Sequence, residues 1–491
     1  MKKFYNILSV MLILALLLPG FVFANNQELY KKVMEKFEPK LNKEKEPVKD
    51  NLEEFFKDED EVRIIVELKS EPSIVYATNK DKSYEMLSNS TINDIERKID
   101  NEQQKVKANI RAQNINMEFI HSFNTAFNGF SGKVKFQDIA LIEKLPSVKK
   151  VYIANEYERP DIKPDMDTSN DMIGSRPTWD IGYKGEGTVI AIIDTGIDPS
   201  HKDMVLSQET EPKLTRETVE GKDLLGKYFT EKVPYGYNYY DLNNEILDLG
   251  PAASMHGMHV AGTAGANGDV ENGGIKGVAP ESQLLAMKVF SNDPIYATTF
   301  SDIYLAAIDE SIKLGADVLN MSLGSTASFY IAESAEDVAL RNATNNGIVC
   351  SVSAGNSAQM TDGYWYPWKD NPDIGVVGAP GLNKDTIQVA SIENTHQKAN
   401  YLMYNDGNDL VKVPMAIAGN INPAEALSKE QEFVDAGSGH PSELTDVAGK
   451  VALVIRGGLT GPFVEKIENA QRAGAVGIII YNHGAGGEEL I

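Results

Sequence analysis

Residues 188–198 read Thr-Val-Ile-Ala-Ile-Ile-Asp-Thr-Gly-Ile-Asp, an apolar run that delivers the carboxylate of Asp194 into a turn. A short apolar run rich in β-branched residues is typical of a strand that is buried on both faces. A carboxylate at the end of such a strand is costly unless it is hydrogen-bonded. We therefore expect a partner close to Asp194, and a histidine on a neighbouring helix is a good candidate.

Outward from this strand, apolar strands alternate with helices. The pattern predicts strands at 188–193, 284–289, 318–321 and 347–352, and helices at 256–266, 301–314 and 332–345. This alternation predicts an α/β fold with a doubly wound parallel sheet, whose site lies at the carboxyl ends of the strands. Asp194 and Asn356 both fall at such ends.

His256 begins a segment of small residues that lets a helix pack tightly against a sheet. The start of that helix would face the sheet edge, where Asp194 is expected. His259 is spaced for a metal-binding pair with His256, but the glutamate of the zinc-protease motif is absent. We therefore interpret His259 as a packed, hydrogen-bonded core histidine.

Two further strands end in small residues. Asn356 follows Ser353, Ala354 and Gly355, and its side-chain amide could donate to a developing oxyanion or could simply form a turn. The other segment, Ser322-Leu323-Gly324, presents backbone that could pair with an extended peptide or could form only a loop.

Together, these segments resemble the subtilisin-like serine peptidases over roughly 179–391, in the family's order of acid before histidine. The resemblance implies that Asp194 orients and stabilises the histidine, that His256 is the general base and acid, and that Asn356 lines the oxyanion hole. It assigns the binding of substrate backbone to Ser322, Leu323, Gly324, Ser353, Ala354 and Gly355.

The resemblance implies that the chemistry requires no cofactor. Asp203 falls where some relatives place a calcium ligand, but the loop 267–275 differs in length from that of the simple subtilisins. Structural calcium is therefore an open expectation, and no metal ligand is assigned. Met258 stands where threonine is usual, a packing change that we expect to be tolerated.

Other segments point to the cell-envelope proteinase (lactocepin-like) branch. Residues 62–153, which include Asn128-Gly129-Phe130, resemble its inhibitory chaperone propeptide, with strands expected at 62–68, 127–136 and 148–153 and helices at 81–117 and 137–144. Residues 454–457, Lys466 and 473–475 resemble an inserted protease-associated domain. The expected organisation is a signal peptide (1–24), a charged leader (25–61), an inhibitor-like propeptide (62–158), a linker and processing region (159–175), the first part of the catalytic domain (176–405) and a truncated, strand-rich protease-associated domain (406–491).

The sequence departs from the family in one important respect. The family's nucleophilic serine starts a helix in a Gly-Thr-Ser-Met-Ala context, and none of the serines after Asn356 has that context. We expect this chain to be the amino-terminal portion of a serine endopeptidase and to be inactive by itself. The alternatives are a secreted pseudoprotease that binds peptides or proteins, and an aspartic protease, which would need a second Asp-Thr-Gly triplet.

The amino-terminal sequence and the charge indicate where the protein works. The chain begins with a pattern typical of a cleaved secretory signal rather than a membrane anchor: Lys2 and Lys3, an apolar stretch at 7–18, and Val22-Phe23-Ala24. We therefore expect a secreted, extracellular or cell-envelope protein. A net charge of −24 argues against nucleic acid and anionic membranes as partners. The expected partners are protein or peptide substrates and the chain's own propeptide. The single cysteine, Cys350, lies in a strand pattern and is expected to be a buried thiol.

Overall fold

The computed structural model describes residues 56–158, 169–249, 253–296, 298–325, 330–356, 377–392, 400–405, 407, 409–417, 422–427 and 430–482. The predicted signal peptide, nearly all of the charged leader and part of the predicted processing region lie outside the described residues. None of the helices that the described residues form has both the length and the apolarity needed to cross a membrane.

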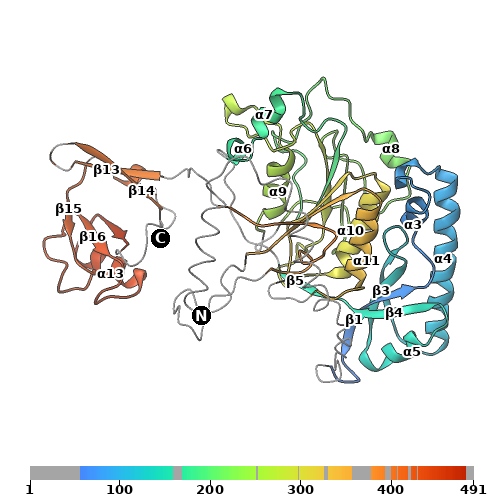
Figure 1. Ribbon diagram of the computed structural model, residues 1–491. Coiled ribbons are helices and arrows are strands. Elements are labelled where there is room, and N and C mark those ends of the chain that lie inside the picture. Colours follow the sequence, from blue (N-terminus) through green and yellow to red (C-terminus); the bar gives the residue numbers. More distant parts are fainter. Residues whose placement is uncertain are drawn as a thin grey trace, which may run out of the picture.

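The centre of the molecule is a six-stranded sheet in the order β12-β11-β10-β6-β8-β7, and every strand pair in it is parallel (Figure 1). The predicted α/β fold is therefore confirmed. The strands are β6 (Val189–Asp194), β7 (Tyr235–Asn238), β8 (Gln283–Lys288), β10 (Val318–Met321), β11 (Val349–Ser353) and β12 (Ile387–Val389).

Helices cover both faces of this sheet. Alternate residues of β6 enter different cores: Ala191 and Ile193 pack in the cluster that holds α10 and α11, whereas Ile192 packs with α9. This is why the strand is apolar throughout. The helices of the domain are α6 (Ser169–Met172), α7 (Ser175–Asp180), α8 (Arg216–Glu220), α9 (His256–Gly265), α10 (Ser301–Lys313) and α11 (Ala335–Asn345), with a 3-10 turn at η4 (Val270–Asn272).

The N-terminal unit has a four-stranded antiparallel sheet in the order β2-β3-β1-β4, with α4 packed on one face. In β1, Ile64 faces α4, and the next residue, Ile65, belongs to the core of the larger domain. The elements are β1 (Glu61–Leu68), α3 (Ser73–Thr78), η2 (Tyr84–Met86), α4 (Asn89–Ala112), β2 (Glu118–Phe123), β3 (Gly129–Lys135), η3 (Phe136–Asp138), α5 (Ile139–Glu143) and β4 (Val148–Ile153).

Two features of this unit differ from the sequence prediction. The long helix expected at 81–117 is shorter, because α4 begins at Asn89, where the side chain of Ser88 accepts a hydrogen bond from the N–H of Thr91. Strand β2 was not predicted at all. It pairs with β3 through an irregular register, so its residues lack the simple alternation that identifies a strand.

A short strand joins the N-terminal unit to the larger domain. Strand β5 (Glu156–Glu158) pairs antiparallel with β9 (Thr298–Phe300), which directly precedes α10. The end of the N-terminal unit thus adds a strand to the domain beside it.

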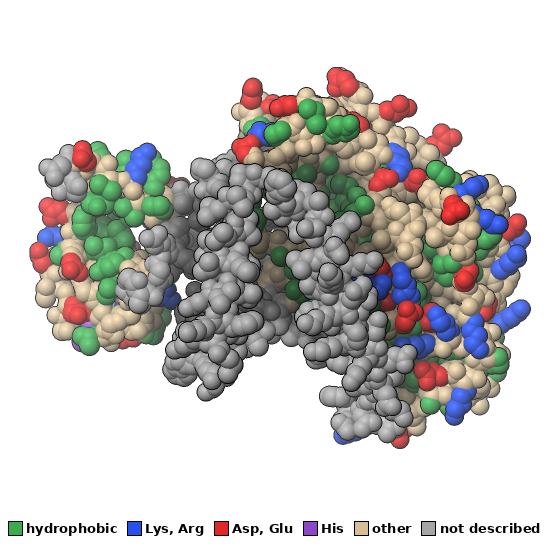
Figure 2. Space-filling view, in the orientation of Figure 1, with side chains coloured by type: hydrophobic (Ala, Val, Ile, Leu, Met, Phe, Trp, Pro, Cys, Tyr) green, Lys and Arg blue, Asp and Glu red, His purple; other side chains and the backbone are tan. Residues whose placement is uncertain are grey.

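The C-terminal module contains a hairpin and a small parallel sheet, β15-β16-β17, packed with one helix. Figure 2 shows hydrophobic side chains gathered on the face of this module that is turned to the viewer, and charged side chains scattered over the N-terminal unit. Its elements are β13 (Asn400–Asn405), β14 (Leu410–Met415), α12 (Pro423–Ala426), β15 (Phe433–Asp435), β16 (Val451–Ile455), α13 (Phe463–Arg472) and β17 (Gly477–Tyr481).

Candidate active site

Asp194 and His256 are in direct contact. The Nδ1 atom of His256 lies 2.8 Å from Oδ1 of Asp194, and both side chains are buried. Because an ionised carboxylate can only accept, the imidazole donates from Nδ1, which leaves Nε2 as the nitrogen that can take up a proton. Strand β6 ends at Asp194 and helix α9 begins at His256, so the sheet edge and the helix start meet as the sequence predicts.

The backbone before the histidine is held in an unusual conformation. Met255 precedes α9 with φ of 56°, in the left-handed region that non-glycine residues rarely adopt. The carboxylate of Asp248 accepts hydrogen bonds from the N–H groups of Ser254 and Met255, at 3.1 and 2.9 Å. These bonds stabilise the turn that aims His256 at Asp194, and no sequence motif had marked Asp248.

Helix α9 approaches the end of β6 closely because residue 257 is a glycine. A Cβ atom there would lie 2.6 Å from the carbonyl oxygen of Gly196, inside any normal contact. The N–H of Gly257 donates instead to Oγ1 of Thr195, at 2.9 Å. On the other side of the turn, the buried ammonium of Lys288 donates to the carbonyl of Thr195. The turn after Asp194 is thus held from both sides.

The pKa of the Asp194 carboxyl is raised, first of all by burial. The hydrogen bond and charge of His256 and the N–H of Thr195, 2.7 Å from Oδ1, act in the opposite direction, whereas Asp248 adds to the rise. Because burial disfavours the charged form of Asp194, the hydrogen bond from the imidazole matters more for keeping the carboxylate ionised. Such an arrangement orients a histidine and stabilises it when it becomes protonated.

The other predicted residues lie on the same edge of the sheet. Asn356 follows β11 and is exposed, and β11 is separated from β6 only by β10. The residues 353–355 lie at the end of β11, with Ala354 buried and Gly355 exposed. The residues 322–324 follow β10, and the carbonyl of Leu323 accepts from Oγ of Ser353 at 3.3 Å. The segments predicted to bind substrate are therefore neighbours, and their roles stay predictions.

Met258 and His259 lie on the first turns of α9. The sulfur of Met258 accepts from the N–H of Asp198 at 3.3 Å, so this residue is part of the packing beside the turn. His259 is half-buried rather than fully buried, and its pKa is lowered first by burial and then by the charge of His256. The interpretation of His259 as a packed core histidine was therefore too strong.

Asp203 is buried beside the loop 267–275, and structural calcium there stays an untested expectation. Oδ2 of its carboxylate accepts a hydrogen bond from the N–H of Ile275 at 3.1 Å. Oδ1 lies against Gly268 and Gly274 of the same loop. Within the described residues no group of three or more His, Cys, Asp or Glu side chains could hold a metal.

Comparison with known proteins gives the family. Residues 185–475 match the family model described as the subtilase family. The chain belongs to the subtilase family. Residues 64–159 match the model described as peptidase inhibitor I9, which covers the four-stranded N-terminal unit and reaches β5.

Several relatives in this family are close to the chain in sequence. A PII-type proteinase of Lacticaseibacillus paracasei is 42% identical over 382 residues, covering 74% of this chain and 20% of the relative. A PI-type proteinase of Lactococcus lactis subsp. cremoris is 41% identical over 382 residues, with the same two shares. The minor extracellular protease Vpr of Bacillus subtilis is 32% identical over 390 residues, covering 74% of this chain and 41% of that protein.

These relatives agree with the branch that the sequence motifs predict. The chain spans about a fifth of the length of the two proteinases and about two fifths of Vpr. The match to the subtilase model extends to residue 475, into the C-terminal module. The interpretation of this module as a protease-associated domain stays a prediction.

The contact between the N-terminal unit and the subtilase domain uses buried acids that sequence reasoning missed. Asp302 and Asp309 lie on α10, and Glu336 lies in the first turn of α11; all three are buried. Oδ1 of Asp302 accepts from Nε of Arg63 at 2.7 Å. Helix α10 is buried over nearly its whole length, as expected of a helix that packs against the sheet on one side and against the N-terminal unit on the other.

Asp309 holds a turn of the N-terminal unit. Its Oδ1 accepts from the N–H groups of Thr125 and Ala126, at 2.8 and 2.6 Å, and Oδ2 accepts from the N–H of Asn124 at 3.1 Å. Burial raises the pKa of this carboxyl, and Lys313 together with the three N–H groups opposes the rise. One side chain of the subtilase domain thus satisfies three backbone donors of the unit that covers it.

Proposed function

We propose that this chain is the amino-terminal portion of an exported serine endopeptidase, made with a propeptide that inhibits it. The observation that carries this proposal is the buried hydrogen bond between Asp194 and His256 at the edge of a parallel sheet. In such a site the imidazole removes the proton of a nucleophilic hydroxyl and returns it to the leaving amine, and the acid stabilises the imidazolium. The side-chain amide of Asn356 is the proposed donor to the oxyanion.

The same proposal explains the position of β5. A segment that pairs with β9 occupies backbone groups that an extended peptide substrate would use. While β5 remains paired, substrate cannot bind there, so the N-terminal unit acts as an intramolecular inhibitor. Release of the unit requires a cut in the processing region at 159–175.

The proposal assigns no nucleophile within these 491 residues. Ser438 and Ser442 lie in the C-terminal module, where Oγ of Ser438 donates to Glu443 at 2.6 Å and Oγ of Ser442 lies 2.8 Å from Nδ1 of His440. Neither contacts the Asp194–His256 pair. We therefore expect the 491-residue chain by itself not to turn over peptides, and a longer chain that supplies a Gly-Thr-Ser-Met-Ala segment to be active.

The decisive experiment uses the complete protein, expressed in a host that lacks other exported proteases. His256→Ala should lower kcat for peptide cleavage by roughly six orders of magnitude, as in subtilisin, and Asp194→Asn by roughly four. Both variants should also fail to release the segment before about Asp171. His201→Ala, a change of an exposed histidine, is the matched control and should be processed normally. Normal processing of the His256 and Asp194 variants would refute the assignment.

The second candidate is a pseudoprotease that binds peptides without cutting them. The observation that favours it is β5 itself, an extended segment already paired with β9. A complete protein that binds peptides saturably, yet never reacts with a fluorophosphonate probe, would establish this alternative and exclude the peptidase.

A further inference from the structure

Strand β5 shows how the subtilase domain holds an extended segment. Tyr157 pairs with Thr299 of β9, between the pairs Glu156–Phe300 and Glu158–Thr298. Glu156 is exposed, whereas only 1% of the Tyr157 side chain is exposed. The strand therefore sends the side chain of its central residue into the domain.

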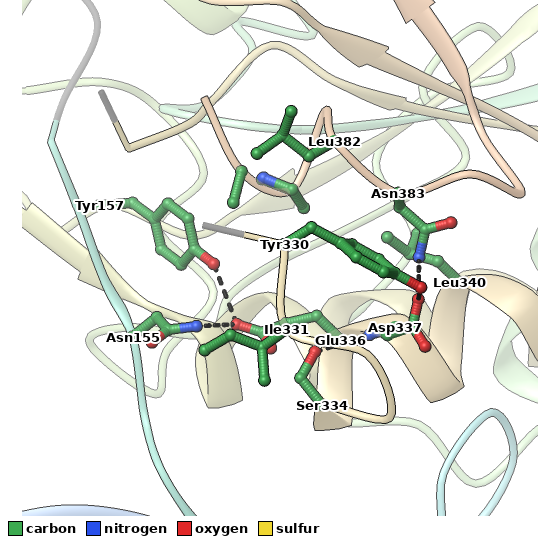
Figure 3. Close-up of a pocket in the computed structure, with 12 residues that line it drawn as sticks. Asn155, Tyr157, Tyr330, Ile331, Ser334, Glu336, Asp337, Leu340, Leu382 and Asn383 are labelled. Carbon is green, nitrogen blue, oxygen red and sulfur yellow. Dashed lines mark hydrogen bonds between the residues drawn. The ribbon is translucent and has the colours of Figure 1, made fainter. Parts of the chain in front are cut away.

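The Tyr157 side chain enters a pocket made by the two helices that follow β9 and β10. Its ring meets that of Tyr304 edge to face, with ring centres 5.3 Å apart. Its hydroxyl donates to Oε1 of Glu336 at 2.9 Å and accepts from the hydroxyl of Tyr304 at 3.0 Å. Figure 3 shows the phenol directed at Glu336, with the amide of Asn155 donating to the same oxygen at 2.8 Å.

The floor of this pocket is a carboxylate rather than an apolar side chain. Glu336 stands at the start of α11, where 7% of it is exposed. Beside it the surface is hollowed into a cavity lined by Tyr330, Ile331 and Pro380. A peptide that replaces β5 would therefore bring its central side chain to the same two polar groups, Glu336 and the Tyr304 hydroxyl.

These two groups have different requirements. The carboxylate can only accept a hydrogen bond, and the Tyr304 hydroxyl needs an acceptor. A phenol satisfies both, since it donates to one and accepts from the other. A phenylalanine offers neither group a partner and leaves Glu336 and the Tyr304 hydroxyl only to each other. A lysine ammonium donates to Glu336 but offers no acceptor to Tyr304. A site built around a hydroxyl discriminates against analogues that lack it, because its buried polar groups then lose a hydrogen-bond partner.

We propose that Glu336, with Tyr304, makes this pocket selective for tyrosine in substrates that pair with β9 at Thr299. This inference rests on the proposed peptidase function, and it names the substrate class of that site. Tyr157 of the N-terminal unit then occupies this pocket before maturation, and it is the kind of side chain that we expect the pocket to prefer.

The test compares peptides on the complete, matured protein. A peptide with the sequence of residues 154–158 competes with fluorescent casein as substrate, and three versions carry Tyr, Phe or Lys at position 157. We expect the Tyr peptide to inhibit about tenfold to a hundredfold more strongly than the Phe peptide, with the Lys peptide weaker than Tyr. Glu336→Leu should bring the Tyr and Phe peptides to within about twofold of each other. Glu333→Gln, a change of an exposed acid two residues before the helix starts, should keep the preference.

A second measurement separates failure of the pocket from failure of the peptidase. In the 491-residue chain, Tyr157→Phe should speed hydrogen exchange at the amides of β5 by about tenfold while those of β6 are unchanged. If casein is not cut but Tyr157→Phe loosens β5, the peptidase proposal fails and the pocket remains. If casein is cut and the Tyr and Phe peptides inhibit equally, the inference about Glu336 is wrong.

Discussion

The two units that flank the subtilase domain are built in opposite ways. The N-terminal unit shares one of its two cores with the domain, because Ile65 and Phe123 pack in the same cluster as α10 and α11, whereas the other face of its sheet packs with α4. Within the described residues, the C-terminal module has a core of its own, made of residues between 434 and 478. We infer that the N-terminal unit depends on the domain for its stability, whereas the module is stabilised from within. Four changes test this difference.

The largest effect is expected at Asp309. Asp309→Ala removes the acceptor of three backbone N–H groups, and three charge-assisted bonds of about 1.5 kcal/mol each correspond to about 4.5 kcal/mol. Hydrogen exchange at the amides of residues 124–126 should become much faster, and the rest of the N-terminal unit should lose protection with them. Asp309→Asn keeps one acceptor oxygen and should lose less. Unchanged protection in both variants would disprove the dependence of the unit on this acid.

The next effect is expected inside the C-terminal module. The buried ammonium of Lys466 donates to the carbonyls of Ser438, Ile455 and Gly457, at 2.6, 3.1 and 2.7 Å. Burial lowers the pKa of this lysine. Lys466→Met leaves three carbonyls without this donor, which should lower the stability of the module by about 3 kcal/mol. The expected loss is smaller than at Asp309, because a buried carbonyl that lacks one hydrogen bond is less costly than a buried N–H group that lacks its only one.

Thermal unfolding followed by hydrogen exchange checks the Lys466 prediction. Strands β15 to β17 should lose protection at a lower temperature, while β1 to β4 keep theirs. Lys450→Met, at a partly exposed lysine that makes surface ion pairs, is the control and should change little. If the N-terminal unit melts together with the module in Lys466→Met, the two units are not independent.

The third test is a change of pH. Burial lowers the pKa of His121 to about 4 from 6.5, with Asp302 opposing this shift and Arg63 adding to it. A histidine whose folded pKa is depressed gives stability that is complete above about pH 6.5 and is lost as the pH falls towards 4. At pH 5 the docked N-terminal unit should therefore be less stable than at pH 8 by about 2 kcal/mol.

The urea midpoint of the N-terminal unit, measured between pH 5 and 8, checks this dependence. His121→Gln removes the titrating group and should flatten the profile in that range. The C-terminal module, measured in the same samples, should not follow the wild-type profile of the N-terminal unit. An identical slope in wild type and His121→Gln would assign the pH dependence to other groups.

The smallest effect is expected at Asn346. Its side chain accepts from the N–H of Tyr84 at 2.7 Å and donates to Oγ1 of Thr78 at 3.0 Å and the carbonyl of Lys82 at 2.9 Å. Asn346 itself is buried, but Thr78 is half-buried and Lys82 is exposed, so water can replace Asn346 at these two partners. Asn346→Ala should therefore weaken docking by about 1 kcal/mol, which would be seen as faster exchange near Tyr84 alone.

The sequence predicted the parts of the fold that follow one regular pattern. Strands β6 and β10 and helix α9 were located to within a residue or two, because each is apolar or small along its whole packed face. Strand β7 was missed because its sequence, Tyr-Gly-Tyr-Asn, has neither the length nor the apolar run of the others. Cys350, expected to be buried, is 2% exposed, and burial raises its pKa to about 11.

The candidate site divides in the same way. Asp194 and His256 could be found because each ends or begins an element at the same sheet edge. Asp309 and Glu336 could not, because an acid on a helix normally indicates a face towards water. Their burial depends on a separate unit that docks on the helix, and a single sequence does not show which surfaces meet. Asp248 was missed for a related reason, since it acts through the backbone of a turn that no motif marks.

The ion pairs between the N-terminal unit and the domain have a consequence for how the two part. Arg63 meets Asp302, Lys213 meets Glu85, and Lys313 meets Glu96 across the contact. On separation each charge regains water and an atmosphere of counterions, which forms more readily at high ionic strength. High salt should therefore speed dissociation of the N-terminal unit from the subtilase domain, whereas low salt should slow it.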